Sequence, residues 1–117
     1  MRPVFLILLA GCGSANLTGV WSGECAFEDY DMLLDLDLTQ SAELLDGTAE
    51  ASFSWQGYDF DFSGTATGSE SEDAVALTLA LGDGGTVSLD MDVASPNRIE
   101  GSCAGDGGIS GGGWLER

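Results

Sequence analysis

Basic side chains are nearly missing from this 117-residue chain. It contains no histidine and no lysine, and its three arginines face 20 acidic residues, which gives a formal net charge of −17. The absence of histidine and lysine excludes the common nucleophile–base triads. A chain with so few cations also lacks the basic footprint that nucleic-acid binding requires. We therefore expect no enzyme activity, no nucleic-acid partner and no cofactor.

Acidic residues are the main chemistry that remains. Paired carboxylates can hydrolyse glycosides, and carboxylate oxygens can bind calcium. The two acidic runs, residues 28–31 and 70–73, lack the spacing of a known calcium loop, so we interpret both as solvated turns and expect no metal site. Apolar–polar alternation places six further aspartates on a solvent face, where carboxylates keep ordinary roles: Asp35, Asp37, Asp59, Asp61, Asp90 and Asp92.

The first twelve residues contain a short apolar run behind one basic residue. Arg2 precedes the run at residues 4–9, which ends in Leu9-Ala10-Gly11-Cys12. The run is far below the ~20 residues that span a bilayer, whereas a basic residue, a short apolar core and small residues before a cleavage point describe an export signal. The segment resembles the signal and lipobox of bacterial lipoprotein precursors.

That resemblance implies a lipid anchor. The signal peptide would be residues 1–11, acylated Cys12 would become the first residue, and residues 12–16 would tether a domain at residues 17–117. Two or three acyl chains anchor a protein far more firmly than a single chain does. Gly13 stands where an aspartate would retain many such proteins in the inner membrane, so the resemblance implies the outer membrane, with the face left open.

Apolar and polar residues alternate through the rest of the chain. Leu34, Leu36 and Leu38 share one face of a strand, with Asp35 and Asp37 on the other. The same period predicts eight strands, at residues 18–27, 34–39, 49–55, 58–62, 75–81, 87–93, 98–104 and 111–116. Turn-forming residues separate them at 46–47, 56–57, 69–73, 82–85 and 95–97.

Regularly spaced strands with short connections predict an all-β fold, either a sandwich or a barrel. Sequential hairpins without a long crossover favour an eight-stranded antiparallel up-and-down β-barrel, because closure removes exposed edges. A transmembrane barrel has the same alternation with its apolar face outward. Several predicted strands are shorter than the ~9–11 residues that it needs, so an apolar interior is favoured.

Two tryptophan motifs lie at the two ends of the predicted barrel. Gly19-Val20-Trp21 resembles the G-x-W signature of the lipocalin and avidin superfamily, and Trp114-Leu115-Glu116-Arg117 resembles the last strand of those barrels. The resemblance implies that Arg117 stacks on Trp21 and closes the barrel floor by a cation–π contact. The biotin-contacting residues of avidins have no match here.

Once Cys12 is acylated, Cys25 and Cys103 remain as an even pair in an oxidising compartment, which predicts a disulfide. The two cysteines fall near the ends of the first and seventh strands, which are not neighbours. A disulfide requires Cα atoms within about 7 Å. We therefore expect the barrel rim to curl inward and partly cover one mouth.

The predicted interior is rich in large side chains, which favours a mostly filled barrel with any small apolar cavity near one mouth. These side chains are Leu34, Leu36, Leu38, Phe53, Trp55, Phe60, Phe62, Leu77, Leu79, Leu89, Met91 and Ile99.

Two functions fit these observations. The first is a lipid-anchored envelope module that binds a small apolar ligand or envelope component, with Trp55, Tyr58 and Phe60 as candidate contacts. The second is a structural or interaction lipoprotein, such as a subunit or inhibitor of an envelope protein, with a filled barrel and no ligand.

Overall fold

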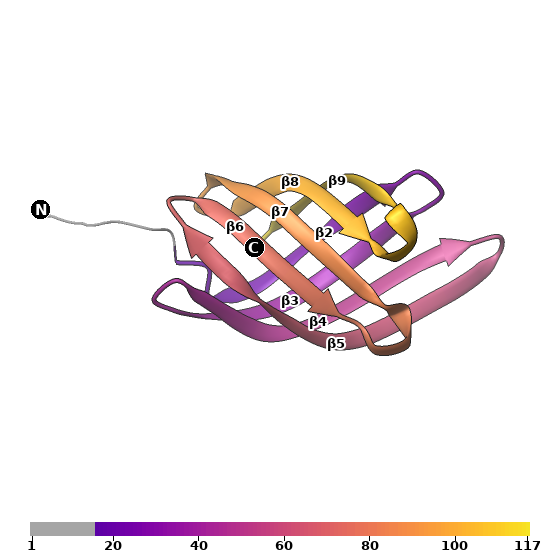
Figure 1. Cartoon of the computed structure of the whole chain (residues 1–117), viewed down its shortest axis with the longest axis horizontal. Helices are drawn as coiled ribbons and strands as arrows, with labels where there is room; N and C mark the ends of the chain where they lie inside the picture. The colour runs from indigo at the N-terminus through magenta and orange to yellow at the C-terminus, as the bar shows by residue number, and fades with distance from the viewer. Residues whose placement is uncertain (1–15) are drawn as a thin grey trace, which may run out of the picture.

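The computed structural model describes residues 16–117 and contains one closed antiparallel barrel (Figure 1). Each strand pairs with the next along the chain, and the last pairs with the first. The strands are β2 (Gly19–Phe27), β3 (Asp31–Ser41), β4 (Leu44–Trp55), β5 (Tyr58–Ser71), β6 (Ala74–Ala80), β7 (Thr86–Ser95), β8 (Arg98–Gly105) and β9 (Ser110–Glu116). Two short 3₁₀ helices, η1 (Gly82–Gly84) and η2 (Asp106–Gly108), connect strands. The predicted eight-stranded up-and-down barrel is confirmed.

The predicted signal peptide and Cys12 lie outside the described residues. Within residues 16–117, no helix has the length and apolar character to cross a membrane.

The interior is apolar and the outer surface is acidic. On β3, Leu34, Leu36 and Leu38 are each 1% exposed, while Asp35 and Asp37 between them face solvent. All six aspartates predicted on the solvent face are exposed. The buried side chains form one cluster that runs through the barrel, which is the main source of its stability because burial of apolar surface contributes about 25 cal/mol per Å².

Two predicted turns are misplaced. The β3–β4 turn is formed by Ala42 and Glu43, and Asp46 and Gly47 lie inside β4 opposite β3. The β5–β6 turn consists of Glu72 and Asp73 alone, because β5 continues through the glycines that follow Phe62. Gly64 shows the reason. A Cβ there would lie 1.7 Å from the Ala80 carbonyl oxygen, so this glycine permits close strand contact and does not end the strand.

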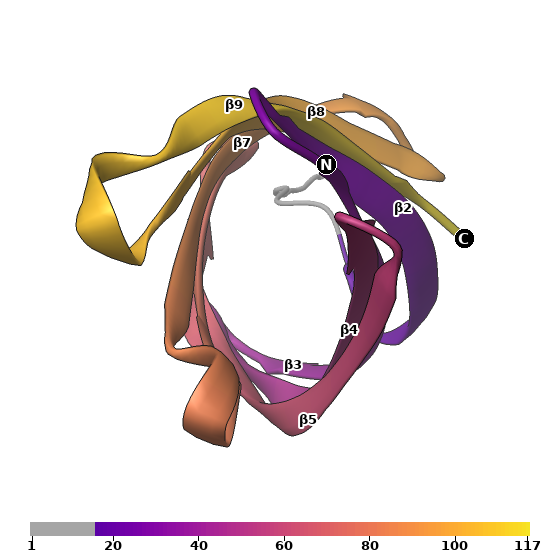
Figure 2. The same cartoon turned by 90° about the vertical axis from the view of Figure 1, so that its right-hand side faces the viewer.

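The barrel has two unlike ends. The end that we call the floor holds residue 16, the C-terminus and the β3–β4, β5–β6 and β7–β8 turns. The end that we call the mouth holds the β2–β3 turn, the β4–β5 turn, η1 and η2. Strands β4 and β5 have 12 and 14 residues against seven in β6, so their hairpin projects past the other mouth loops (Figure 1). Figure 2 shows the barrel from the mouth end.

Arg117 and Trp21 close the floor. The Arg117 Cζ lies 4.6 Å from the centroid of the buried Trp21 ring. Its guanidinium donates to the carbonyl oxygens of Thr18 at 3.0 Å and Pro96 at 2.7 Å. The Trp21 indole N–H donates to the Leu17 carbonyl at 2.8 Å. Segments from both ends of the chain are thus tied together over one ring.

A buried carboxyl group completes the floor. Glu70, which we interpreted as part of a solvated turn, is fully buried. Its side chain accepts hydrogen bonds from the Gln40 amide at 3.2 Å and from the Asp73 backbone N–H at 3.0 Å. Gln40 in turn accepts from the Leu17 N–H at 2.7 Å. Glu70 is buried because strand β5 extends to Ser71 and places Glu70 on its inward face.

The predicted Cys25–Cys103 disulfide is present, and the sheet bends inward to form it, because strands on either side of a third lie about 9.6 Å apart in a flat sheet. The two cysteines belong to β2 and β8, which flank β9, and their Cα atoms are 6.0 Å apart. The bond crosses the inner face of β9 at Gly113, where a Cβ would lie 2.4 Å from the Cys103 Sγ. A glycine between the two cysteines therefore brings them within reach, and both are buried in the core.

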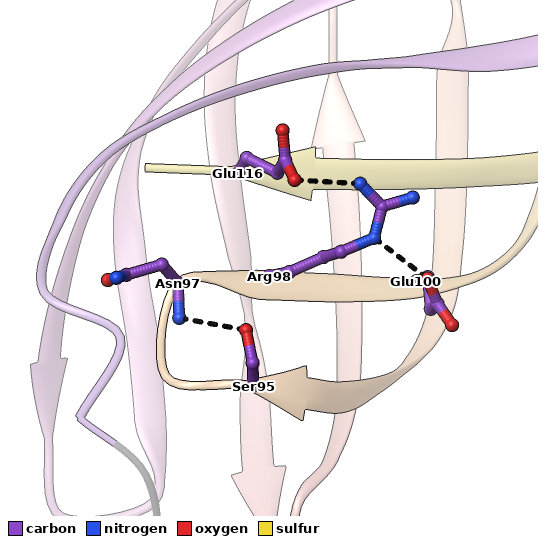
Figure 3. Close-up of polar contacts among 5 residues, drawn as sticks. All are labelled: Ser95, Asn97, Arg98, Glu100 and Glu116. Atoms are coloured by element: carbon purple, nitrogen blue, oxygen red, sulfur yellow. Dashed lines mark hydrogen bonds and ion pairs between the residues drawn. The ribbon is translucent and has the colours of Figure 1, made fainter.

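A polar seam joins β8 and β9 near the floor (Figure 3). Arg98 donates to Glu100 and to Glu116, both at 2.8 Å. These two hydrogen bonds raise the pKa of Arg98 above its ordinary value. Its guanidinium also lies 5.0 Å from the centroid of the Trp114 ring. Arg98 and Arg117, the two cations of the described chain, thus both sit at the floor end.

Candidate ligand-binding mouth

Aromatic side chains gather at the mouth, on the inner face of the projecting hairpin. The Tyr30 ring stacks on Phe53 with centroids 4.2 Å apart, and Phe53 stacks on Phe60 at 5.1 Å. Phe60 and Phe62 are nearly parallel, with an interplanar angle of 8° and centroids 6.5 Å apart. We call Tyr30, Phe53, Phe60 and Phe62 the aromatic cluster. All four are partly exposed, so the cluster is neither core nor free surface.

Local sequence places each ring. Phe60 and Phe62 are two residues apart on β5 and so share a face, and Phe53 is the Cα partner of Phe60 on β4. Tyr30 comes from the β2–β3 turn, which is closed by a hydrogen bond from the Phe27 N–H to the Tyr30 carbonyl at 3.0 Å. The cluster therefore joins two hairpins that are adjacent in the barrel.

The barrel interior is packed with large side chains, and open space is present at the mouth. The largest fully buried side chains fill the interior from floor to mouth: Trp21, Leu17, Leu34, Leu36, Leu38, Leu77, Leu79, Leu81, Leu89, Met91, Ile99 and Leu115. A recess of about 290 Å³ opens at the mouth between the β2–β3 turn and η2, lined by Phe27, Glu28, Asp29, Tyr30 and Ile109 among others. This volume lies near the lower limit for small-molecule sites.

A second, more open recess of about 530 Å³ lies along the projecting hairpin. Its apolar lining includes Phe53 and Phe60, and its polar lining includes Asp31, Asp59 and Asp61. The Ser54 hydroxyl donates to the Asp59 carboxylate across the hairpin, which holds that carboxylate in place. The larger recess thus lies mainly on the outer face of the hairpin, whereas the smaller recess combines Tyr30 with acidic groups at the mouth itself.

Of the three candidate contacts, only Phe60 joins the aromatic cluster. Trp55 and Tyr58 lie opposite each other at the hairpin tip and are 44% and 70% exposed. Trp55 was predicted inside the barrel. That prediction is wrong because the hairpin outruns the neighbouring strands, so no opposite wall covers its last residues.

Sequence reasoning missed part of the cluster. Phe53 and Phe62 were predicted as ordinary core, although their spacing with Phe60 on paired strands could have indicated a shared surface. Tyr30 stands inside an acidic run and carried no signal of its own. Burial, and then the negative charge of Asp29, raise the pKa of the Tyr30 phenol above its ordinary value of 10.0. Tyr30 is therefore a neutral hydrogen-bond donor and stacking surface at neutral pH.

Within residues 16–117, no group of three or more histidine, cysteine, aspartate or glutamate side chains is arranged to hold a metal ion.

Comparison with known proteins identifies the fold and no family. No family model matches the chain, and no curated protein matches it in sequence. Solved structures do match. A redesigned β-barrel, mFAP1, bound to DFHBI, has a TM-score of 0.69 at 21% identity, covering 86% of this chain and 94% of that one. The redesigned barrel b11L5F_LGL gives 0.68 at 20% identity, covering 86% and 90%.

A third structure, EF1p2_mFAP2b bound to DFHBI, has a TM-score of 0.67 at 19% identity and covers 86% of this chain and 93% of that one. At such low identity the likeness concerns the backbone alone. It shows that this chain shares the fold of those structures, a closed eight-stranded barrel.

Proposed function

We propose that this chain is a non-catalytic, lipid-anchored protein of the bacterial cell envelope that binds a small planar apolar molecule at the barrel mouth. The observation that carries the ligand site is the aromatic cluster, whose neighbouring rings are inclined to each other by 19°, 24° and 8°. Rings that share an orientation and remain partly exposed offer a stacking surface to a flat molecule, worth about 0.5–1.5 kcal/mol for each aromatic pair.

The structural neighbours support the part of this proposal that concerns a small-molecule ligand. Two of them are described as bound to DFHBI, so barrels of this backbone shape accept a small organic ligand. In the present chain the interior is filled by leucines, and the site is therefore placed at the mouth and not deeper in the barrel.

The anchor is supported by the resemblance of Leu9-Ala10-Gly11-Cys12 to a lipobox, and the fold indicates which end of the barrel such an anchor would hold. Residue 16 lies at the floor, where Leu17 is buried beneath the barrel. A short acylated tether would therefore hold the floor toward the membrane, with the outer membrane as the proposed location. The aromatic cluster lies at the opposite end, where a ligand can reach it from the aqueous side.

A dye titration tests the binding site. We would titrate the purified protein with Nile red, a neutral planar dye, and with DFHBI, and follow fluorescence. Phe60→Leu removes a ring but keeps apolar volume, and we expect it to weaken dye binding about 3- to 10-fold. Leu44→Ala is the matched control, because Leu44 is 67% exposed on the same hairpin but at the floor end. Equal effects of the two variants would refute the site.

Mass spectrometry of the protein from its own membranes tests the anchor. A mass that begins at Cys12 and includes acyl chains supports it. A mass that retains residues 1–11 without lipid refutes it.

Exposed aromatic residues at the hairpin tip favour a second candidate function, docking to an envelope protein by a lipoprotein with a filled barrel. Trp55 and Tyr58 are 44% and 70% exposed, and tryptophan and tyrosine are enriched among residues that dominate protein interfaces. A photo-crosslinking residue at position 58 should then yield one discrete adduct in native membranes. The same residue at position 44 should yield none.

A further inference from the structure

Charge at the mouth has one sign. The mouth turns and the strand ends beside them carry six acidic residues and no basic residue: Glu28, Asp29, Asp31, Asp59, Asp83 and Asp106. Arg98 and Arg117 both lie at the floor, where Arg98 is paired with Glu100 and Glu116. The negative charge of the mouth is therefore not balanced by the described cations.

Acids and a ring of the cluster share the smaller recess, which Glu28 and Asp29 line together with Tyr30. Asp31 and Asp59 lie nearby, on the outer face of the strands that carry the other rings. A ligand stacked on the aromatic cluster would thus lie within the field of these carboxylates. At physiological ionic strength the screening length is about 8 Å, so neighbouring carboxylates act on such a ligand while the distant arginines at the floor do not.

Two physical effects then favour positive charge on the ligand. Carboxylates around a recess attract cations and repel anions, and an aromatic face attracts a cation placed over it. Resting on the proposed function, we infer that the natural ligand of the mouth is a planar aromatic cation, held by stacking on the aromatic cluster and by the surrounding carboxylates.

Matched dyes test the inference. Thioflavin T is a planar cation, and its analogue without the N-methyl group has the same rings and no charge. We would titrate the full-length protein with each dye by calorimetry at low and high salt. We expect thioflavin T to bind about tenfold more tightly than the analogue in 20 mM salt, and the difference to fall to about twofold in 0.5 M salt.

Charge-matched variants locate the effect. The mouth variant Glu28→Gln, Asp29→Asn, Asp83→Asn removes three exposed carboxylates. The floor variant Glu43→Gln, Asp46→Asn, Glu72→Gln changes the net charge by the same amount at the opposite end. We expect the mouth variant to weaken thioflavin T binding about 3- to 10-fold and to leave the uncharged analogue unchanged. The floor variant should leave both affinities unchanged.

Failures of the two proposals are distinguishable. If the uncharged analogue binds as tightly as thioflavin T, or if both variants weaken thioflavin T equally, the inference about charge is overturned and the ligand site stands. If neither dye binds, the ligand site and the inference are both overturned.

Discussion

Replacing Gly113 with alanine should destabilise the barrel much more when the Cys25–Cys103 disulfide is present than when it is absent. A Cβ at Gly113 would lie 2.4 Å from the Cys103 Sγ, 3.3 Å from the Cys25 Sγ and 2.9 Å from the Glu24 carbonyl oxygen. The first contact is impossible without movement, and both sulfur atoms are buried. Overpacking of this kind costs about 1–3 kcal/mol.

The cost of Gly113→Ala is compared with the stability that the disulfide itself contributes. It closes a loop with a sequence separation of 78 residues. The chain-entropy model assigns such a loop about 4.5 kcal/mol, and measured values are typically about 2–4 kcal/mol. The double variant Cys25→Ala, Cys103→Ala should lower the free energy of unfolding by about 2–4 kcal/mol. In this background Gly113→Ala meets only the Glu24 carbonyl, so its cost should fall by about 1–2 kcal/mol.

Denaturant unfolding of four proteins measures this coupling as a double-mutant cycle. The four are the parent, Gly113→Ala, the cysteine-free variant and their combination, with the oxidised state verified by mass. Gly112→Ala is the control, because the nearest atom to a Cβ there is the Gly101 carbonyl oxygen at 3.8 Å. An equal cost of Gly113→Ala in both backgrounds would refute the reasoning that the disulfide needs this glycine.

Three further predictions concern the floor and the mouth. Arg117→Gln removes the contact with Trp21 and should lower the free energy of unfolding by about 1–2 kcal/mol, with a change in tryptophan emission; an unchanged unfolding curve would contradict it. Glu70→Leu removes the acceptor of two partly buried hydrogen bonds and should cost about 1–3 kcal/mol in the same assay, whereas Glu70→Gln retains an acceptor and should cost less. The raised pKa of Tyr30 means that the folded state holds the phenol proton more tightly than the unfolded state does. Stability from this group is thus complete below pH 10 and is lost as pH rises through the folded pKa. Tyr30→Phe should reduce the alkaline loss of stability, and Asp29→Asn should lower the Tyr30 pKa in an absorbance titration; no difference from the parent would contradict this.

The sequence predicted the number of strands and the face that each buries, because alternation is local, but it ended β5 at residue 62 where the strand continues to Ser71. Leu34, Leu36 and Leu38 face inward as the pattern required, and Asp35 and Asp37 face outward. Turns were predicted less well, because glycine can mark either a turn or a close approach of two strands. Gly47 has the second role, and the turn lies at Ala42 and Glu43, which carry no turn signal.

The candidate site was predicted only in part. Phe60 was named from its place beside a hairpin turn, and it does lie in the aromatic cluster. Tyr30 reaches the cluster from a different hairpin, and only the pairing of β3 with β4 brings the two hairpins together. Local sequence contains no information about that contact, because residues 30 and 53 meet only after the sheet has formed.

By itself the sequence determined which face of each strand is buried, since side chains alternate along a strand whatever its neighbours are. It also determined the acidic character of the outer surface and the cysteines available for a disulfide. Only the tertiary structure decided where each strand ends relative to the next. That relation exposes Trp55 at the tip of a projecting hairpin, buries Glu70 in the floor and carries a disulfide across Gly113. The physical reason is that barrel closure sets the stagger between strands, and stagger depends on pairing over the whole sheet.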